Sequence, residues 1–98
     1  MIEKWTIQLT KRAKKDLEDL QSERGKALRA ILRLEQDPHT GHLLSGALRG
    51  VRSLEFSLPG GAYRAAYDLD TEKRVCLVFL IGPHENFYEK AERRYRSI

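Results

Sequence analysis

The run VCLVFLI, from Val75 to Ile81, is the feature that most limits how this chain can fold, because every residue in it is apolar. A strand with two apolar faces needs a covering layer on each side, as in the centre of a sheet. The run is too short to cross a membrane as a helix. Gly82 and Pro83 then end it. The chain must therefore place this strand in its interior and flank it with others.

Two segments upstream of this run alternate as half-buried strands do. In VRSLEFSL, Leu54, Phe56 and Leu58 share one face, and serine and glutamate side chains share the other. AYRAAYDL alternates again and puts Arg64 on its polar side. The PGG sequence between them is typical of a turn. Together these segments predict an antiparallel hairpin with one apolar and one polar face.

The register of this hairpin follows from its turn residues. Matching the apolar faces permits Leu58 to lie opposite either Gly61 or Tyr63. The first register leaves a two-residue loop that begins with proline, and such loops require a positive φ there, which proline cannot adopt. We therefore expect a four-residue loop, with Glu55 and Arg64 as diagonal neighbours on the polar face. A plain salt bridge on a solvated face is the simpler interpretation of that pair.

The rest of the chain is predominantly helical in pattern. Residues 5–9 (WTIQL) alternate as a short strand, and Thr10 is the predicted N-cap of the helix that follows. Residues 13–20 carry one apolar stripe, and a second helix runs to Asp37, where the next residue is proline. A final helix begins near Phe87. Residues 39–50 lose periodicity and are predicted to form a loop.

The element order is therefore βααβββα, which indicates an α+β class. We expect a helical hairpin packed on a mostly antiparallel, four-stranded, twisted sheet. A chain of 98 residues predicts one domain, spanning residues 1–98.

The charge and composition of the chain limit the classes of partner and cofactor that it is expected to bind. The net charge of +4 and the pI near 9.4 favour an anionic partner, nucleic acid first, although a solvated basic surface is the alternative. A single cysteine, Cys76, excludes an intramolecular disulfide and a thiolate metal cluster. Histidine spacing typical of zinc sites is absent, so we expect no metal and no cofactor. Residues 1–9 contain charges and no apolar signal core, which predicts a cytoplasmic protein without a membrane partner.

Three stretches carry a resemblance to a known family. LTKRAKKDLEDL, YRAAYDLD and FLIGPHENFYEKAERR, in this order, resemble the opening, central strand and tail of RelE/ParE superfamily toxins of type II toxin–antitoxin systems. The resemblance covers nearly the whole chain. It implies a RelE-like fold, a cognate antitoxin partner, and a homodimer or a toxin–antitoxin hetero-oligomer. RelE-like members cut mRNA, usually at the ribosome and without a metal, whereas ParE-like members inhibit DNA gyrase.

The resemblance also implies catalytic residues. HLLSGALRG, which begins at His42, is similar to a YafQ-type segment that begins with a catalytic histidine, and GPH with His84 looks like the terminal GTH of such toxins. Arg64 matches the arginine that RelE and YoeB use on the scissile phosphate. Glu55 falls where relatives carry a catalytic histidine or lysine. Tyr88 matches the catalytic tyrosine of RelE if two residues are deleted before it.

Two departures from the family pattern stand beside these matches. The two strand lysines of RelE are replaced by Ser53 and Glu55, and a YafQ aspartate is replaced by Ala62. A carboxylate near the scissile phosphate repels it unless Arg64 compensates. The simpler interpretations are that His42 is a surface histidine and that His84 caps the last helix.

Metal-free RNA cleavage defines the role that each residue would take. It needs a base for the 2′-hydroxyl, an acid for the leaving 5′-oxygen and a cation for the phosphate. We assign the acid to His84, the base to His42 or Glu55 with the order open to reversal, and the phosphate to Arg64, whose planar fork binds two oxygens. Basic residues expected to contact RNA phosphates are Lys11, Arg12, Lys14, Lys15, Arg49 and Arg52.

The leading hypothesis is therefore an mRNA endoribonuclease toxin (an mRNA interferase) that binds mRNA and the ribosome. The alternatives are a non-catalytic ParE-like inhibitor of gyrase and a catalytically inactive relative that only binds its antitoxin.

Overall fold

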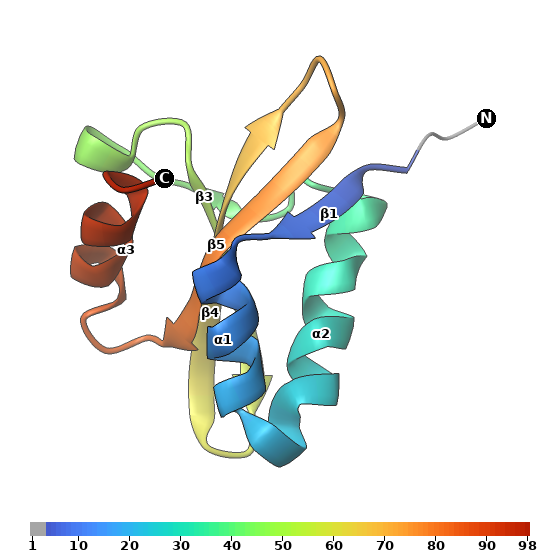
Figure 1. The fold of residues 1–98 in the computed structure, drawn as a ribbon, viewed down its shortest axis with the longest axis vertical. Coiled ribbons are helices and arrows are strands. Elements are labelled where there is room, and N and C mark those ends of the chain that lie inside the picture. Colours follow the sequence, from blue (N-terminus) through green and yellow to red (C-terminus); the bar gives the residue numbers. More distant parts are fainter. Residues whose placement is uncertain (1–3) are drawn as a thin grey trace.

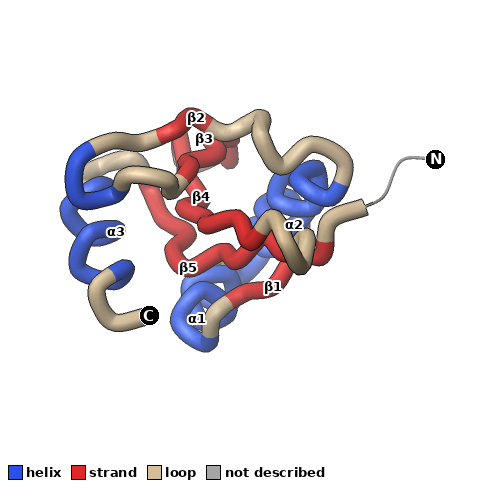
Figure 2. Tube along the Cα trace, turned by 90° about the horizontal axis from the view of Figure 1, so that it is seen from above, coloured by secondary structure: helices blue, strands red, loops and turns tan. Residues whose placement is uncertain are grey.

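A computed structural model describes residues 4–98 and shows one sheet covered by two helices on one face and a third helix on the other (Figures 1 and 2). The strand order is β1-β5-β4-β3-β2, with β1 parallel to β5 and the other pairs antiparallel. No helix in this range is long and apolar enough to cross a membrane. The elements are β1 (Thr6–Leu9), α1 (Lys11–Asp19), α2 (Arg24–Leu32), β2 (His42–Leu43), β3 (Arg52–Leu58), β4 (Gly61–Asp70), β5 (Val75–Pro83) and α3 (Phe87–Tyr95), with 3₁₀ turns at Gln21–Glu23, Arg33–Glu35 and Gly46–Leu48.

The apolar run forms the central strand β5, which confirms the prediction made from its composition. It pairs with β1 on one side and β4 on the other. A bulge separates the pairs Ala66–Leu80 and Tyr67–Val78, so Phe79 is the extra residue. Val78 packs under α1 and α2, whereas Phe79 and Leu80 both pack on the α3 side. The bulge thus supplies two consecutive side chains to the smaller core beneath α3.

The sheet has five strands rather than four, so the predicted strand count was wrong. The extra strand is β2, two residues long, which pairs His42 with Ser53 and Leu43 with Arg52. Two residues are too few to produce an alternating pattern, which is why this segment was interpreted as loop.

Contacts to Tyr67 hold the segment that leads into β2. The buried Tyr67 hydroxyl donates to the Pro38 carbonyl at 2.6 Å and accepts from the Gly41 amide at 2.9 Å. A Cβ at position 41 would lie 2.3 Å from the Tyr67 hydroxyl oxygen, so only glycine fits there.

The register of the β3–β4 hairpin also differs from the prediction. Leu58 lies opposite Gly61, which leaves a two-residue loop, and Glu55 lies directly opposite Arg64 instead of diagonally. The argument from Pro59 fails because the positive φ falls on Gly61, at 131°, one residue after the loop. Proline therefore keeps its usual negative φ. The direct pairing brings the glutamate and arginine closer than the predicted register would.

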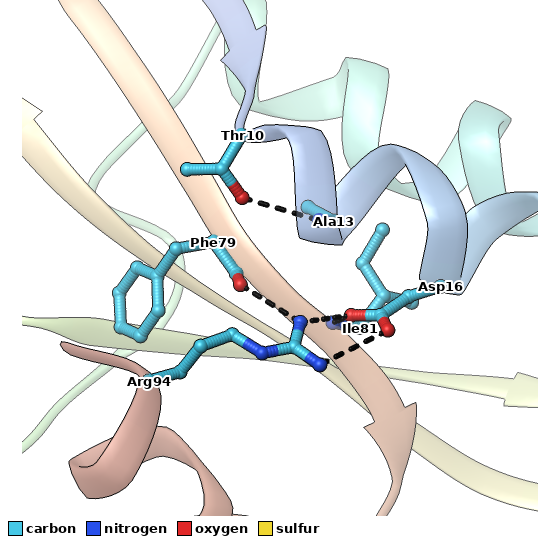
Figure 3. Close-up of polar contacts among 6 residues, drawn as sticks. All are labelled: Thr10, Ala13, Asp16, Phe79, Ile81 and Arg94. Carbon is cyan, nitrogen blue, oxygen red and sulfur yellow. Dashed lines mark hydrogen bonds and ion pairs between the residues drawn. The ribbon is translucent and has the colours of Figure 1, made fainter. Parts of the chain in front are cut away.

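An ion pair ties α3 to the rest of the fold (Figure 3). The Asp16 carboxylate of α1 accepts from the guanidinium of Arg94 in α3, at 2.5 and 3.2 Å, and from the Ile81 amide at 3.0 Å. Arg94 also donates to the Phe79 carbonyl at 3.1 Å. The side chains of Asp16 and Arg94 are only 16% and 22% exposed. The carboxylate and guanidinium thus fasten α1, the bulge of β5 and α3 together.

Thr10 caps α1 as predicted, because its hydroxyl accepts from the Ala13 amide at 3.1 Å (Figure 3). The cap fixes where α1 begins. The expected helical hairpin, with Ala13 and Ile31 fully buried against the sheet, is confirmed.

Candidate active site

Arg64 lies on the same sheet face as α3, at a point where the surface is open. Its partner on β3 is Glu55 and its partner on β5 is Gly82. A Cβ built on Gly82 would meet nothing within 4 Å. The missing side chain therefore leaves unfilled space beside Arg64.

Two side chains orient the Arg64 guanidinium. Nη1 of Arg64 donates to the Tyr88 hydroxyl, and Cζ lies 5.3 Å from the centroid of the tyrosine ring. Nη2 lies 3.9 Å from Oε1 of Glu55. The Arg64 side chain is 22% exposed and Glu55 is 60% exposed, so the glutamate can swing into solvent while the arginine stays in place. Arg64 is thus a positioned cation with a displaceable carboxylate beside it.

His42 reaches this face through β2. Directly paired residues of an antiparallel sheet project to the same side, so His42 shares the face of Ser53 and, two residues on, of Glu55. The exposed His42 borders two hollows. The edge hollow measures about 480 Å³ and its lining includes Arg33, Asp37, Thr40, His42, Ser53 and Glu55. The tyrosine hollow measures about 300 Å³ and its lining includes His42, Leu44, Ser45, Leu48, Tyr88 and Glu92.

His84 lies one step further along the sheet from Arg64. Its amide donates to the Ala62 carbonyl at 3.2 Å, which extends the β4–β5 ladder and sets His84 diagonally from Arg64. Its imidazole is 52% exposed, with Nδ1 4.0 Å from Oε1 of Glu85. The N-cap of α3 is Asn86, so the interpretation of His84 as the capping residue was wrong. The backbone of His84 is therefore diagonal to that of Arg64, but its imidazole contacts the neighbouring Glu85.

The residues expected to bind RNA divide into two groups. Arg52 donates to the carbonyls of His39 and Gly41, at 3.1 and 2.9 Å, so it holds the loop before β2. Lys15 is paired with Asp19 at 2.6 Å on the surface of α1. The α1 helix covers the sheet face opposite α3, away from Arg64 (Figure 2). The remaining basic residues of the prediction are exposed: Lys11, Arg12 and Lys14 on α1, and Arg49 before β3.

Sequence reasoning missed two features of this face. Ser53 was expected on a solvated surface, yet it is 3% exposed, and its hydroxyl has no hydrogen-bond partner in the part of the chain that the structure describes. No local pattern distinguishes Asp16 from the other charged residues of α1, although it anchors α3. The role of Asp16 depends on where α3 packs, which only the tertiary structure decides. Among residues 4–98, no group of three or more histidine, cysteine or acidic side chains is arranged to hold a metal ion.

The sequence of this chain matches a known protein family. A family model described as the ParE-like toxin of type II bacterial toxin–antitoxin systems matches residues 6–92. A search of curated proteins gave no match.

Solved structures share the fold at low sequence identity. The RelBE2 toxin–antitoxin complex of Mycobacterium tuberculosis matches with a TM-score of 0.71 and 22% identity, over 86% of this chain and 95% of that one. A mutant of Escherichia coli RelE in the free state matches with a TM-score of 0.72 and 19% identity, over 97% and 98%. The archaeal RelE–RelB complex of Pyrococcus horikoshii matches with a TM-score of 0.56 and 16% identity, over 82% and 94%.

Proposed function

We propose that this chain, which belongs to the family described as ParE-like toxins of type II toxin–antitoxin systems within the RelE/ParE superfamily, is a metal-free endoribonuclease that cuts mRNA at the ribosome. The observation that supports this most is the setting of Arg64, a guanidinium held by Tyr88 and Glu55 beside an open stretch of sheet. A planar guanidinium with displaceable partners suits a phosphate that gathers charge. His42 and His84 lie on either side of it along the sheet.

The reaction would proceed by attack of the 2′-oxygen of the RNA on the neighbouring phosphorus. A base removes the 2′-hydroxyl proton, the bond from phosphorus to the 5′-oxygen breaks, and an acid protonates that oxygen. The products are a 2′,3′-cyclic phosphate and a free 5′-hydroxyl. His84 is the acid in this proposal, and His42 or Glu55 is the base. Arg64 carries the phosphate charge, and Tyr88 holds the guanidinium in position.

Substitution of Arg64 and His84 tests this proposal. Arg64→Ala should lower the cleavage rate by about 10²–10³-fold, and His84→Ala by about 10²–10⁴-fold, while growth arrest on expression is lost. Arg96→Ala removes an exposed arginine beyond the site and should change neither readout. RNA with a 2′-deoxy nucleotide at the cleavage position should resist cutting. If both variants still arrest growth and no RNA is cut, the enzymatic proposal fails.

Substitution of Glu55 distinguishes a role as general base from a role as a carboxylate that competes with phosphate for Arg64. If Glu55 is the base, Glu55→Gln lowers the cleavage rate at saturating RNA. If Glu55 only competes with phosphate for Arg64, Glu55→Gln lowers KM and leaves kcat unchanged, because a repelling charge is removed. Ser57→Ala, on the same face of β3 one step further along, is the control.

A second candidate is a toxin that acts by binding alone, as ParE-like members do. Two observations favour it: the matching family model is described as a ParE-like toxin, and His84 contacts Glu85 instead of Arg64. A supercoiling assay with purified DNA gyrase tests this candidate directly, since inhibition that survives Arg64→Ala would support it.

A cognate antitoxin completes the proposal. Relatives of the same fold were crystallised with RelB, in the complexes from Mycobacterium tuberculosis and Pyrococcus horikoshii described above. We propose that this chain likewise forms a hetero-oligomer with a partner protein that blocks growth arrest. Co-expression with the neighbouring reading frame, followed by joint purification, would test this.

A further inference from the structure

We infer that the two hollows beside Arg64 are separate subsites for the nucleobases on either side of the cleaved phosphate, and that the edge hollow selects a base with an exocyclic amino group. This inference rests on the proposed function, because it takes the phosphate on Arg64 as its starting point. Beyond the proposed function, it states which nucleobases the protein itself would select.

Each hollow has one lining residue that contacts Arg64, although Arg64 itself lines neither hollow. Glu55 lines the edge hollow, and its carboxylate lies 3.9 Å from Nη2 of Arg64. Tyr88 lines the tyrosine hollow, and its hydroxyl accepts from Nη1. His42 lines both hollows and separates them. Since an RNA chain carries one base on each side of every phosphate, a phosphate on Arg64 would direct one base into each hollow.

The edge hollow presents hydrogen-bonding groups that distinguish bases. Asp37 and Glu55 bring carboxylates, which accept from an exocyclic amino group such as N4 of cytosine. Uracil has a carbonyl oxygen at that position, which carboxylates repel. Arg33 and Thr40 bring donors for the ring acceptors of the same base. The hollow should therefore prefer cytosine or adenine to uracil.

The tyrosine hollow is suited to stacking. Tyr88 is 41% exposed although Arg64 lies against its ring, so part of the aromatic surface remains open. Leu44 and the buried Leu48 lie in the same lining, together with the polar side chains of His42, Ser45 and Glu92. Stacking on an aromatic ring accepts every base, because each base has a π-face. Among the described residues, the carboxylate of Glu92 is the one acidic group in this lining, whereas the edge hollow has two, so this subsite should select among bases less strongly than the edge hollow.

Binding of 2′-deoxy dinucleotides tests the two subsites, since they lack the attacking hydroxyl and stay intact. Titration of the isotope-labelled protein, followed by NMR chemical shifts, gives affinity and location together. Replacing cytosine by uracil should weaken binding about tenfold at one position of the dinucleotide and less than about twofold at the other. An abasic nucleotide should weaken binding at both positions.

Asp37→Asn supplies the decisive variant, because Asp37 lies outside the proposed catalytic groups. It should reduce the preference for cytosine over uracil to about twofold or less, while Glu72→Gln, with the same charge change in the distant β4–β5 turn, leaves it intact. If RNA is cut but all dinucleotides bind alike, or Asp37→Asn keeps the full preference, the subsites are refuted and the proposed function stands. Absence of saturable binding in the millimolar range refutes the subsites whatever the cleavage result. If the preference is present and RNA is never cut, the proposed function fails alone.

Discussion

Asp16→Ala should destabilise this fold more than any other single charge removal on α1. Asp16 is the acceptor for the Ile81 amide and for two nitrogens of Arg94. Leaving a buried donor unsatisfied costs about 1–3 kcal/mol, and breaking a fully buried ion pair costs about 3–5 kcal/mol. The side chains of Asp16 and Arg94 are 16% and 22% exposed. Arg94 can therefore turn toward water once Asp16 is removed, so the loss of this ion pair costs less than that of a fully buried one. We therefore expect the free energy of unfolding to fall by about 2–3 kcal/mol.

Urea unfolding followed by circular dichroism measures this change. Asp16→Asn keeps an acceptor for the Ile81 amide, so it should lower the free energy of unfolding by about half as much as Asp16→Ala. In a double-mutant cycle with Arg94→Met, the coupling energy should be about 1–2 kcal/mol. For a domain of this size, a loss of 2–3 kcal/mol lowers Tm by about 8–24 °C.

The control for this cycle lies on the same helix. Lys15 and Asp19 form an ion pair of 2.6 Å, close to the 2.5 Å of Asp16 and Arg94, but both side chains are more than half exposed. Removing Asp19 should leave stability unchanged within error, because solvent screens the exposed pair. Equal effects of Asp16→Ala and Asp19→Ala, or a coupling energy below about 0.5 kcal/mol, would refute the reasoning from burial.

Three further predictions follow from buried polar groups. Tyr67→Phe should lower the free energy of unfolding by about 1–3 kcal/mol in urea titrations, because the Gly41 amide and the Pro38 carbonyl lose their partner. Burial raises the pKa of Tyr67 and that of Cys76 to about 12, from 10.0 and 9.0. The unfolded chain ionises first, so stability should be constant below about pH 9 and fall as pH rises toward 12; a flat alkaline profile of urea midpoints would contradict this. Cys76 should react with a maleimide at pH 8 only in denaturant, and labelling of the native protein at the same rate would contradict its burial.

Local patterns were sufficient to predict most elements. The apolar run of β5, the alternation of β3 and β4, and the cap at Thr10 each reflect a period or a hydrogen bond within a few residues. The candidate site was predicted only as a set of residue types. Its members lie on β2, β3, β4, the end of β5 and α3, so their convergence depends on pairings between distant segments.

The register of the β3–β4 hairpin could not be predicted correctly from its turn residues. Pro59 was taken to forbid a two-residue loop, but Gly61 adopts the positive φ and the short loop forms. Both registers keep the apolar faces matched, so the alternating pattern of the strands could not distinguish them. The direct pairing of Glu55 with Arg64 is the consequence that matters for the site.

The sequence by itself determined the α+β class and the buried central strand, because periodicity and composition act through nearest neighbours along the chain, and the resemblance of three stretches to known toxins indicated the family. Only the tertiary structure decided that Tyr88 holds Arg64, that His42 borders two hollows, and that Asp16 fastens α3. These contacts join residues from 24 to 78 positions apart, as in the pairs of Arg64 with Tyr88 and of Asp16 with Arg94. A pattern within a few residues cannot predict contacts between residues so far apart in sequence, since these contacts form only when the sheet packs against its helices.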